Sequence, residues 1–489
     1  MATVELDPQQ LLIGGEWVPA SSGRAWDSSG PVAGVGATPV AAAGPDDVQR
    51  AAEAAQAAFP AWSNTPPGER RALLSRAADL LQERSEQIAA IVTEETGGTF
   101  GWGMFNCGLA AGMLREAAAQ AYGLIGEVIP SDVPGLLALG VRQPVGVIAG
   151  IAPWNAPVIL GTRAIATPLA YGNTVILKAS EECPRTHAAI VAAVKDAGVP
   201  DGVVNLIVND PADAAAVVEA LIAHPAVRRI NFTGSTRVGR IIAEKAGAHL
   251  KRVLLELGGK APMIVLDDAD LDAAAAAANF GAFMHQGQIC MSTERIVADR
   301  SIVGDFSGRL AARAGGLVVG DPRNPETQIG PVVNEGALRR ISELVEDARG
   351  KGADVMTGGE ADGLIYKPTV LSGVTPDMRI YGEESFGPVV SIVPVDGIDE
   401  AVRVANDTEY GLSAAVFGQD VPRAFDVARR VESGICHVNG TTVHDEPQMP
   451  FGGVKASGFG RFGGRAALDE FTELRWITVG GPQGRHYPI

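Results

Sequence analysis

Residues 145–151 read Val-Gly-Val-Ile-Ala-Gly-Ile, the first of a series of short β-branched runs. Alanine-rich stretches with helical character separate this run from the next ones. Similar runs lie at residues 174–177, 203–208, 229–232 and 253–255. This alternation predicts βαβ units, in which helices cover both faces of a parallel sheet.

A second alternating series extends from residue 262 to about residue 439. It includes an expected helix over 337–349, a strand over 389–394 and a helix over 400–406. The two series predict two α/β domains that join near Gly258-Gly259. Upstream of both, residues 46–96 place apolar side chains at three-to-four residue spacing, which indicates helices.

Two segments with strand character stand outside these series, at residues 127–141 and 471–479. Neither has an obvious partner strand in either series. A small sheet completed between subunits would explain both segments, and an edge strand of one domain is the alternative. We therefore expect a homodimer or homotetramer.

The acidic composition restricts the possible partners. The 489 residues carry 57 acidic and 40 basic side chains, a formal net charge of −17, without a run rich in Lys and Arg. This charge repels nucleic acid and anionic membranes, so a small neutral molecule is the more suitable partner. The N-terminus lacks the pattern of a signal peptide, and the apolar runs are too short to span a bilayer.

The four cysteines lie far apart, without a Cys-x-x-Cys spacing, and the seven histidines form no cluster with the spacing of metal ligands. This is the pattern of a reduced, cytoplasmic protein, and we expect no metal site.

One cysteine follows a glycine-containing turn, in Gly287-Gln288-Ile289-Cys290-Met291-Ser292. A thiol becomes a strong nucleophile when a neighbouring group removes its proton, because its ordinary pKa is about 8.5. The alternative is a buried cysteine that acts as a small hydrophobic side chain, and this segment alone favours that alternative.

Two other segments favour catalysis. Glu256 ends an apolar strand beside the Gly258-Gly259 turn, where partial burial would raise its pKa and make it a proton acceptor. Asn155 follows another apolar strand, and strand ends of open α/β sheets are where ligands bind. A thiol, a carboxylate and an amide donor can together add a nucleophile to a carbonyl, stabilise the oxyanion and activate water. A surface carboxylate and a turn-capping amide are the structural alternatives.

Seven motifs spread over nearly the whole chain closely resemble those of the aldehyde dehydrogenase superfamily, in the family's order. They are Pro153-Trp154-Asn155, Leu177-Lys178-Ala179-Ser180-Glu181, Phe232-Thr233-Gly234-Ser235, Glu256-Leu257-Gly258-Gly259-Lys260, Gly287-Gln288-Ile289-Cys290, Glu383-Glu384-Ser385-Phe386-Gly387-Pro388 and Pro450-Phe451-Gly452-Gly453. A single motif of this kind has little specificity, whereas seven in order are highly specific.

The resemblance implies a division of the chain into a Rossmann-like NAD-binding domain, a second α/β catalytic domain and a small β oligomerisation segment. The expected bounds are 1–122 and 145–256 for the first, 257–467 for the second, and 123–144 with 468–489 for the third.

The resemblance also implies the catalytic roles. Cys290 attacks the aldehyde to give a thiohemiacetal, while the Asn155 side chain and the Cys290 backbone N–H hold the oxyanion. Hydride leaves to the nicotinamide, and Glu256 activates the water that hydrolyses the resulting thioester. Glu256 argues against a CoA-acylating relative, which would need no base for hydrolysis.

The cofactor signal is indirect, because no Gly-x-Gly-x-x-Gly follows a strand. Instead, the run 229–232 leads into Gly234 and Ser235 at the start of an expected helix, where backbone N–H groups can bind a pyrophosphate. A plain Ser N-cap is the alternative. By resemblance, Gly234 and Ser235 contact the pyrophosphate, and Trp154 belongs to the same cofactor site.

Four further residues are implied for cofactor binding. Lys178 and Glu181 would contact the adenosine ribose, Glu384 the nicotinamide ribose, and Phe386 would pack near the nicotinamide ring. Lys178 and Glu181 could each also be plain surface charges at a strand exit. A carboxylate at Glu181 accepts hydrogen bonds from ribose hydroxyls but repels a 2′-phosphate, so NAD is expected rather than NADP. Family members often have proline where this chain has Ala179.

The substrate side is suggested by three residues. Ala156 stands where many relatives carry a large aromatic residue, which leaves extra room. Arg163 lies in an apolar expected helix and would meet either a polar substituent of the substrate or an acidic partner in an ion pair. Trp102 could supply a flat wall for an aromatic ring or belong to the core.

Two longer stretches resemble the branch that contains salicylaldehyde, vanillin and benzaldehyde dehydrogenases. They are residues 110–116 with 126–135, and residues 443–450 with 463–476. We therefore expect a hydroxylated benzaldehyde-type substrate, as in the breakdown of plant-derived or polycyclic aromatics. The alternatives are a semialdehyde or aliphatic aldehyde dehydrogenase and, more distantly, a cofactor-free cysteine esterase.

Overall fold

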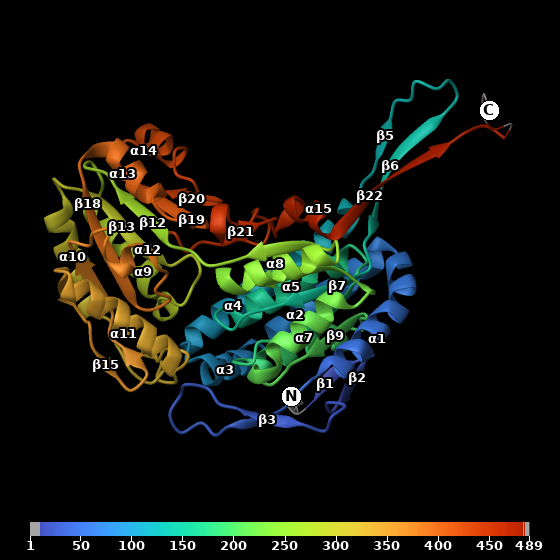
Figure 1. The fold of residues 1–489 in the computed structure, drawn as a ribbon, viewed down its shortest axis with the longest axis horizontal. Helices are drawn as coiled ribbons and strands as arrows, with labels where there is room; N and C mark the ends of the chain where they lie inside the picture. The colour runs from blue at the N-terminus through green and yellow to red at the C-terminus, as the bar shows by residue number, and fades with distance from the viewer. Residues whose placement is uncertain (1–9, 483, 485–488) are drawn as a thin grey trace.

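The computed structural model describes residues 10–482, 484 and 489. The N-terminal stretch that lacks a signal-peptide pattern (residues 1–9) lies outside the described residues, and so do 483 and 485–488 of the expected oligomerisation segment. The described chain forms two α/β lobes and a projecting β arm (Figure 1). Among the described residues, none of the helices combines the length and hydropathy needed to cross a bilayer.

The first lobe contains the predicted parallel strands, each within one or two residues of its expected run. They are β7 (Val147–Ile151), β8 (Thr174–Lys178), β9 (Val204–Ile207), β10 (Val227–Thr233) and β11 (Arg252–Glu256). Their spatial order is β9-β8-β7-β10-β11, with every adjacent pair parallel. The chain thus moves outward from β7 to β9 and then returns to the other side of β7. This reversal between β7 and β10 is a topological switch point, outside which ligands bind in doubly wound sheets.

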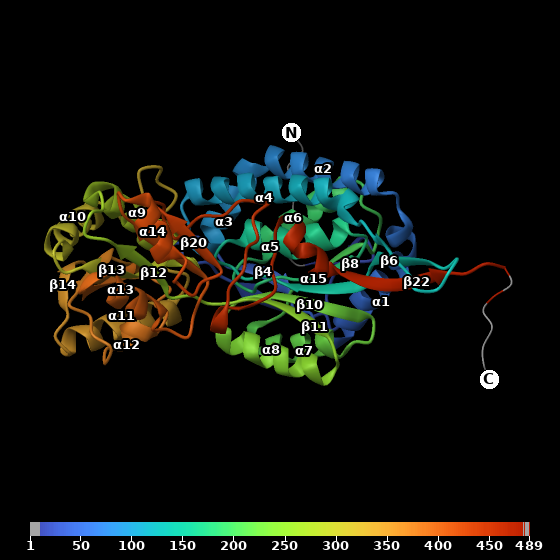
Figure 2. The same ribbon diagram turned by 90° about the horizontal axis from the view of Figure 1, so that it is seen from above.

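Helices cover both faces of this sheet (Figure 2). On one face lie α5 (Pro157–Ala170) and α6 (Pro184–Asp196). On the other lie α1 (Pro45–Asn64), α7 (Ala214–Ala223) and α8 (Thr236–Ala248). A further layer packs on α5 and α6, formed by α2 (Pro67–Glu83), α3 (Ser85–Thr96) and α4 (Phe100–Gln120). The helices expected over residues 46–96 are confirmed as α1, α2 and α3.

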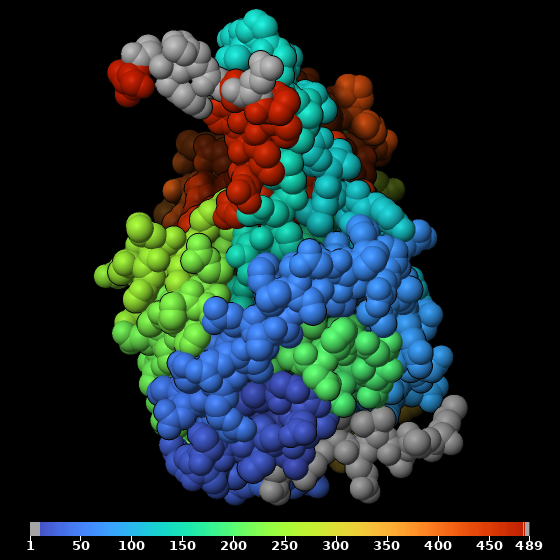
Figure 3. Space-filling model, turned by 90° about the vertical axis from the view of Figure 1, so that its right-hand side faces the viewer, coloured from blue at the N-terminus to red at the C-terminus, as the bar shows by residue number. Residues whose placement is uncertain are grey.

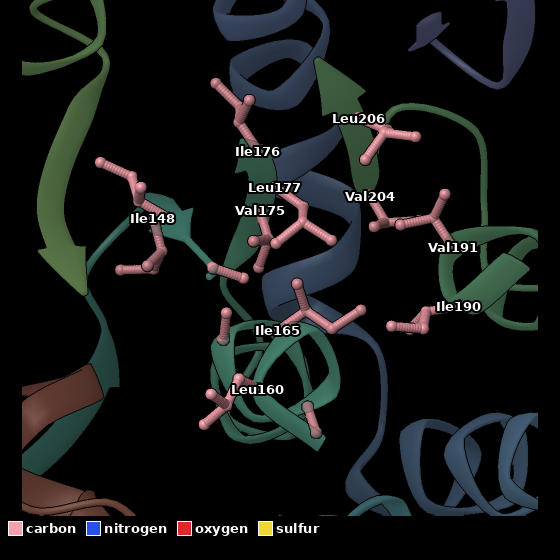
Figure 4. Close-up of a cluster of buried hydrophobic side chains, with 14 of the residues drawn as sticks. Ile148, Leu160, Ile165, Val175, Ile176, Leu177, Ile190, Val191, Val204 and Leu206 are labelled. Carbon is pink, nitrogen blue, oxygen red and sulfur yellow. The ribbon is translucent and has the colours of Figure 1, made fainter. Parts of the chain in front are cut away.

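Burial on both faces explains why these strands lack polar alternation. All residues of β7, β8 and β9 are buried. Figure 4 shows their aliphatic side chains, Val175 and Leu206 among them, packed with Leu160, Ile165 and Ile190 of the covering helices. A rigid core of this kind holds the carboxyl ends of the strands in fixed relative positions.

Short strands extend the sheet at both edges. β1 (Leu11–Ile13) pairs antiparallel with β9, and β2 (Glu16–Val18) pairs with β1. At the other edge, β21 (Gly458–Phe459) pairs antiparallel with β11. The chain therefore returns to the first sheet after it has built the second lobe.

The chain enters the second lobe through Gly258-Gly259, between β11 and β12 (Ala261–Val265). The sheet there has the order β14-β17-β18-β13-β12-β19-β20. The remaining bounds are β13 (Thr293–Asp299), β14 (Asp354–Thr357), β17 (Thr369–Ser372), β18 (Val389–Val395), β19 (Ser413–Phe417) and β20 (Ile435–Val438). The strand expected over 389–394 is β18.

Helices also cover both faces of the second sheet, and each face has its own apolar cluster. One cluster includes α9 (Leu271–Phe283) and α10 (Val303–Gly315). The other includes α11 (Glu335–Gly350), α13 (Gly397–Asn406) and α14 (Val421–Ala428). The helices expected over 337–349 and 400–406 are confirmed as α11 and α13.

The arm joins two segments that are far apart in the sequence. β6 (Leu137–Pro144) pairs antiparallel with β5 (Glu127–Ile129) on one side and with β22 (Thr472–Val479) on the other. The strand character expected for both segments is confirmed, and each finds a partner in the other. Figures 1 and 3 show the arm projecting beyond the body of the molecule.

Candidate active site

A cavity of about 310 Å³ opens at the switch point of the first sheet. Its walls include residues that directly follow β7 and β10, namely Trp154, Asn155, Gly234 and Ser235. The end of β11 adds Glu256, and the second lobe adds Cys290, Glu384 and Phe386. Parallel strands end at the same edge of a sheet, so side chains that are separate in the sequence converge here. We call this space the switch-point cavity.

A second cavity of about 330 Å³ lies on the other side of the thiol. Its walls are mostly apolar and come from α4, α5 and α9 and from the chain between β20 and β21, with Trp102, Ile159, Phe280 and Phe451 among them. Asn155 and Cys290 line both cavities. A molecule in this apolar cavity and one in the switch-point cavity would therefore meet at the sulfur atom.

Cys290 lies in the loop between the turn η3 (Met284–Gly287) and β13, and it is partly buried. Burial, with the nearby carboxylates of Glu256 and Glu384, raises the pKa of the thiol to about 12. Gly259 passes close to its backbone, because a Cβ on Gly259 would lie 2.3 Å from the Cys290 carbonyl oxygen. The Gly-Gly linker thus lets the nucleophile loop sit against the end of β11, and the thiol stays protonated until a base acts on it.

Glu256 is the last residue of β11 and is 2% exposed. Its two carboxylate oxygens have no hydrogen-bond partner among the described residues. Burial raises the pKa of this carboxyl group to about 8, against the opposing attraction of Arg163 and Arg461. A carboxyl group with a pKa near neutrality, facing a cavity without a competing partner, has the properties of a general base.

Asn155 sits where the chain leaves β7, before α5 begins at Pro157. Its backbone carbonyl accepts a hydrogen bond from the indole Nε1–H of Trp102, at 3.3 Å. The residue is buried, and its side chain amide can donate to an oxygen atom near Cys290.

Glu384 and Phe386 are held by a buried ion pair that was not expected from the sequence. Lys260 Nζ lies 2.7 Å from Glu294 Oε2, and both side chains are almost fully buried. The Glu294 carboxylate accepts hydrogen bonds from the backbone N–H groups of Ser385 and Phe386. Lys260 is the last residue of the motif that begins at Glu256, and Glu294 stands at the start of an apolar strand. A charged residue at each of these positions was the signal in the sequence that could have indicated the pair.

Gly234 and Ser235, expected at the pyrophosphate, lie at the N-terminus of α8 and line the switch-point cavity. Ser235 is the N-cap of α8, and its hydroxyl accepts a hydrogen bond from the backbone N–H of Val238 at 3.4 Å. Ser235 is therefore both an N-cap and a residue of the cavity wall, and the one role does not exclude the other. Across the cavity, the Glu384 carboxylate accepts a hydrogen bond from the Gly259 N–H at 2.8 Å, and burial raises its pKa to about 7.

Lys178 and Glu181 lie at the end of β8, beside β7, but do not line the switch-point cavity. Lys178 Nζ lies 2.5 Å from Glu181 Oε1, which also accepts a hydrogen bond from Asn209 at 2.7 Å. These contacts hold a carboxylate at the end of β8, one strand away from the switch point.

All three residues expected on the substrate side line the apolar cavity, namely Trp102, Ala156 and Arg163. Arg163 is buried and forms an ion pair with Asp445, so the alternative of an acidic partner holds for this residue. Its guanidinium also stacks over the ring of Phe451, 4.1 Å from the centroid. The Arg163 charge is thus engaged by the protein.

We expect Arg163→Leu to lower the free energy of unfolding by about 3 kcal/mol, because it strands the buried Asp445 carboxylate. Denaturant titration measures this change. The double variant with Asp445→Leu should recover most of the loss, since both buried charges are then removed. A single variant as stable as the wild type would show that the ion pair contributes nothing to the free energy of unfolding.

The same variant tests substrate recognition. If it keeps the wild-type preference between phenolic and unsubstituted benzaldehydes, Arg163 does not recognise the substrate.

Comparison with known proteins places this geometry in one family. Residues 17–477 match the aldehyde dehydrogenase family. The chain is 57% identical to a vanillin dehydrogenase of Pseudomonas sp. (strain HR199 / DSM 7063), over 98% of this chain and 99% of that protein. It is 40% identical to an NAD(+) benzaldehyde dehydrogenase of Pseudomonas putida, over 96% of each.

Among solved structures, a salicylaldehyde dehydrogenase from Pseudomonas putida G7, complexed with salicylaldehyde, has a TM-score of 0.96 and 46% identity. The match covers 98% of this chain and 99% of that one. The similarity extends over almost the full length of all three relatives, and the chain belongs to the aldehyde dehydrogenase family.

Proposed function

We propose that this chain oxidises an aromatic aldehyde, of the hydroxylated benzaldehyde type, to the carboxylic acid, with NAD as the hydride acceptor. One observation carries the proposal: Cys290 and Asn155 form the common wall of an apolar cavity and of the cavity at the switch point. The first has the volume and lining of a small-molecule site, and the second has the position of a dinucleotide site.

Cys290 is the proposed nucleophile. Its sulfur bonds to the aldehyde carbon, and the carbonyl oxygen becomes the oxyanion of a thiohemiacetal. The Asn155 side chain and the Cys290 backbone N–H are the proposed donors to that oxygen. Because burial raises the pKa of the thiol to about 12, its proton must leave as the bond forms, and Glu256 is the proposed base that accepts it.

The residues of the switch-point cavity fit NAD. The N-terminus of α8 offers backbone N–H groups to a pyrophosphate, and Gly258 leaves room beside Glu384, since a Cβ there would lie 2.6 Å from its Oε2. We assign Gly234 and Ser235 to the pyrophosphate, Glu384 to a ribose, and Trp154 with Phe386 to the walls near the nicotinamide. When bound there, NAD supplies the acceptor for the hydride of the thiohemiacetal carbon.

After hydride transfer the acyl group remains on Cys290 as a thioester. Glu256 first releases the thiol proton to solvent. It then removes a proton from water, the water oxygen bonds to the acyl carbon, and the thiolate leaves with its electron pair. The unpartnered carboxylate oxygens of Glu256 are available for this step. Hydrolysis by this base distinguishes the proposal from transfer of the acyl group to CoA.

Glu181 supports NAD over NADP. Its carboxylate beside Lys178 is held by contacts within the protein, and a 2′-phosphate in that position would be repelled. The name of the Pseudomonas putida relative agrees, since that enzyme is called a benzaldehyde dehydrogenase of the NAD(+) type.

An aromatic substrate is supported by the cavity walls and by the relatives. Trp102, Phe280 and Phe451 surround the space, and Ala156 leaves it open. The named substrates of the relatives, vanillin and salicylaldehyde, are hydroxylated aromatic aldehydes. A semialdehyde is less suitable, because Arg163 is engaged by Asp445 and is not left to bind a substrate carboxylate.

A panel of aldehydes assayed with NAD and NADP in parallel tests the proposal. We expect kcat/KM to be highest for vanillin, salicylaldehyde or benzaldehyde with NAD, and the product to be the free acid without added CoA. Far higher efficiency with succinic semialdehyde or butanal would overturn the aromatic assignment. Ester hydrolysis that ignores NAD, without reduced cofactor from any aldehyde, would instead support a cysteine esterase.

We also propose that residues 123–144 and 468–489 mediate self-association, apart from the cofactor domain (1–122 and 145–256) and the catalytic domain (257–467). The arm exposes large apolar side chains: Val128 and Trp476 are each 74% exposed and Leu474 is 57% exposed. Several large apolar side chains exposed on one projecting element are typical of an interface. Analytical ultracentrifugation should show a dimer or tetramer, and a monomer would contradict the assignment.

We also propose a cytoplasmic location for the protein, which its four unpaired cysteines support.

A further inference from the structure

We propose that His285 is a positioning residue for aromatic substrates, and that it acts by supporting the indole ring of Trp102 from outside the apolar cavity. The inference rests on the proposed oxidation of aromatic aldehydes. Trp102 lines the apolar cavity, whereas His285 lines neither that space nor the switch-point cavity. Any effect of His285 on the substrate must therefore pass through another side chain.

The two rings are stacked. Their centroids lie 4.7 Å apart with an interplanar angle of 13°, and His285 is 3% exposed. The indole is also held at its edge, because its Nε1–H donates to the carbonyl oxygen of Asn155. A face contact and an edge contact together define the plane of the indole. The position of the aromatic wall is thus linked to the backbone of the proposed oxyanion donor.

His285 also joins the walls of the two cavities. Its ring lies 6.4 Å from that of Trp154, which lines the switch-point cavity and meets the edge of Phe386 at 5.8 Å. On the other side, Trp102 stacks on Phe105 at 5.6 Å. A continuous row of rings therefore runs from one cavity wall to the other, with His285 in its centre.

The backbone around His285 is strained in a way that this contact explains. His285 and Gln286 have φ values of +49° and +56°, a left-handed conformation that side-chain-bearing residues rarely adopt. The Gln286 side chain anchors the turn by donating to the carbonyl oxygens of Gly97 and Pro331, each at 2.9 Å. The turn directs the His285 ring onto Trp102 and leads within a few residues to Cys290. Such strain persists where the surrounding contacts determine it.

The backbone of Gly98 confines the stacked rings of Trp102 and His285. A Cβ on Gly98 would lie 2.7 Å from Trp102 Cδ1 and 3.1 Å from His285 Cε1, so the backbone of Gly98 touches both rings. The imidazole nitrogens have no hydrogen-bond partner among the described residues, and burial lowers the pKa of the ring to about 3. What His285 provides is therefore the face of a neutral ring, not a charge or a hydrogen bond.

Two substitutions distinguish the effect of the flat ring face of His285 from the effect of its ring nitrogens. His285→Leu keeps an apolar side chain but removes the flat face, and His285→Phe keeps the face but removes the nitrogens. His249→Leu, at an exposed histidine at the end of α8, is the matched control. Each purified variant is assayed at saturating NAD with benzaldehyde and with butanal, after a thermal unfolding curve has shown that it is folded.

We expect His285→Leu to lower the ratio of kcat/KM for benzaldehyde to that for butanal about fivefold, mainly through KM for benzaldehyde. His285→Phe should keep the ratio within about twofold of the wild type, and the control should not change it. Gly98→Ala should shift the ratio in the same direction as His285→Leu, because its Cβ pushes the rings apart. This variant retains both rings and serves as the test if the leucine variant does not fold.

Equal losses for both substrates would show a purely structural role and overturn the inference, and so would an unchanged ratio in a folded leucine variant. An equal loss of ratio in His285→Phe would assign the effect to the nitrogens and also overturn it. These results are distinct from failure of the proposed function. That failure appears in the wild type itself, as a preference for butanal over every aromatic aldehyde.

Discussion

Replacing Cys290 with alanine is expected to lower kcat for aldehyde oxidation by at least about four orders of magnitude. The thiol is the nucleophile proposed at the wall shared by the two cavities, and without it no covalent intermediate can form. A spectrophotometric assay of NADH formation with benzaldehyde and vanillin measures the loss. Binding of aldehyde and NAD should persist, because the remaining walls of both cavities are unchanged.

Cys436→Ala is the matched control for this substitution. Cys436 is also a partly buried free thiol whose pKa is raised by burial, but it lies on β20 and lines neither cavity. It should retain wild-type kcat. Turnover that survives in Cys290→Ala would exclude Cys290 as the nucleophile, and an equal loss in Cys436→Ala would point to a general effect of losing a buried thiol.

Replacing Glu256 with glutamine should lower steady-state kcat about 100- to 10,000-fold. Glutamine keeps the shape of the side chain but cannot accept a proton, so hydrolysis of the thioester becomes slow. The first turnover also slows to the extent that Glu256 deprotonates the thiol. Rapid mixing with benzaldehyde and NAD should separate the two effects, because it measures the rate of the first NADH per site apart from the rate of the later turnovers.

The pH dependence follows from the same group. Burial raises the pKa of Glu256 to about 8, so the carboxylate required as the base forms only as the pH rises through that value. Wild-type kcat should increase from pH 6 to pH 9, by about tenfold per unit below pH 8. The thiol, with a pKa near 12, does not titrate in this window. The residual activity of Glu256→Gln should lose the rise near pH 8 and keep only the change that Glu384 causes, since burial raises the pKa of that carboxyl group to about 7.

Two results would contradict this role. A glutamine variant with the same pH profile as the wild type would show that another group titrates. A variant with normal steady-state turnover would show that water needs no base at this position. Glu53→Gln is a suitable control, because this glutamate is exposed on α1 and lines neither cavity.

The strands of the first sheet could be predicted from local pattern, because strands buried between helical layers are rich in β-branched and other apolar residues. β7, β8 and β10 were found in this way, to within one or two residues. The edge strands β1 and β21 could not be found. They are two or three residues long, and their pairing depends on chain segments that lie far away in the sequence.

The candidate site also contains residues that could be predicted from the sequence and residues that could not. Cys290, Glu256 and Asn155 stand at conspicuous places in the sequence, and the motifs around them show the family. Their partners do not. Asp445 was one acidic residue among many until the fold placed it against Arg163, and the imidazole of His285 became significant only when it was found stacked on Trp102.

The amino-acid sequence determined the order of the secondary-structure elements, the chemical groups available for catalysis and the membership of the family, because each of these is encoded locally. Only the tertiary structure decided that Cys290 and Asn155 are common to two cavities, that Glu256 is buried without a partner, and that Arg163 is neutralised by Asp445. Burial and charge pairing depend on which distant segments meet, and the pKa values that control catalysis follow from them.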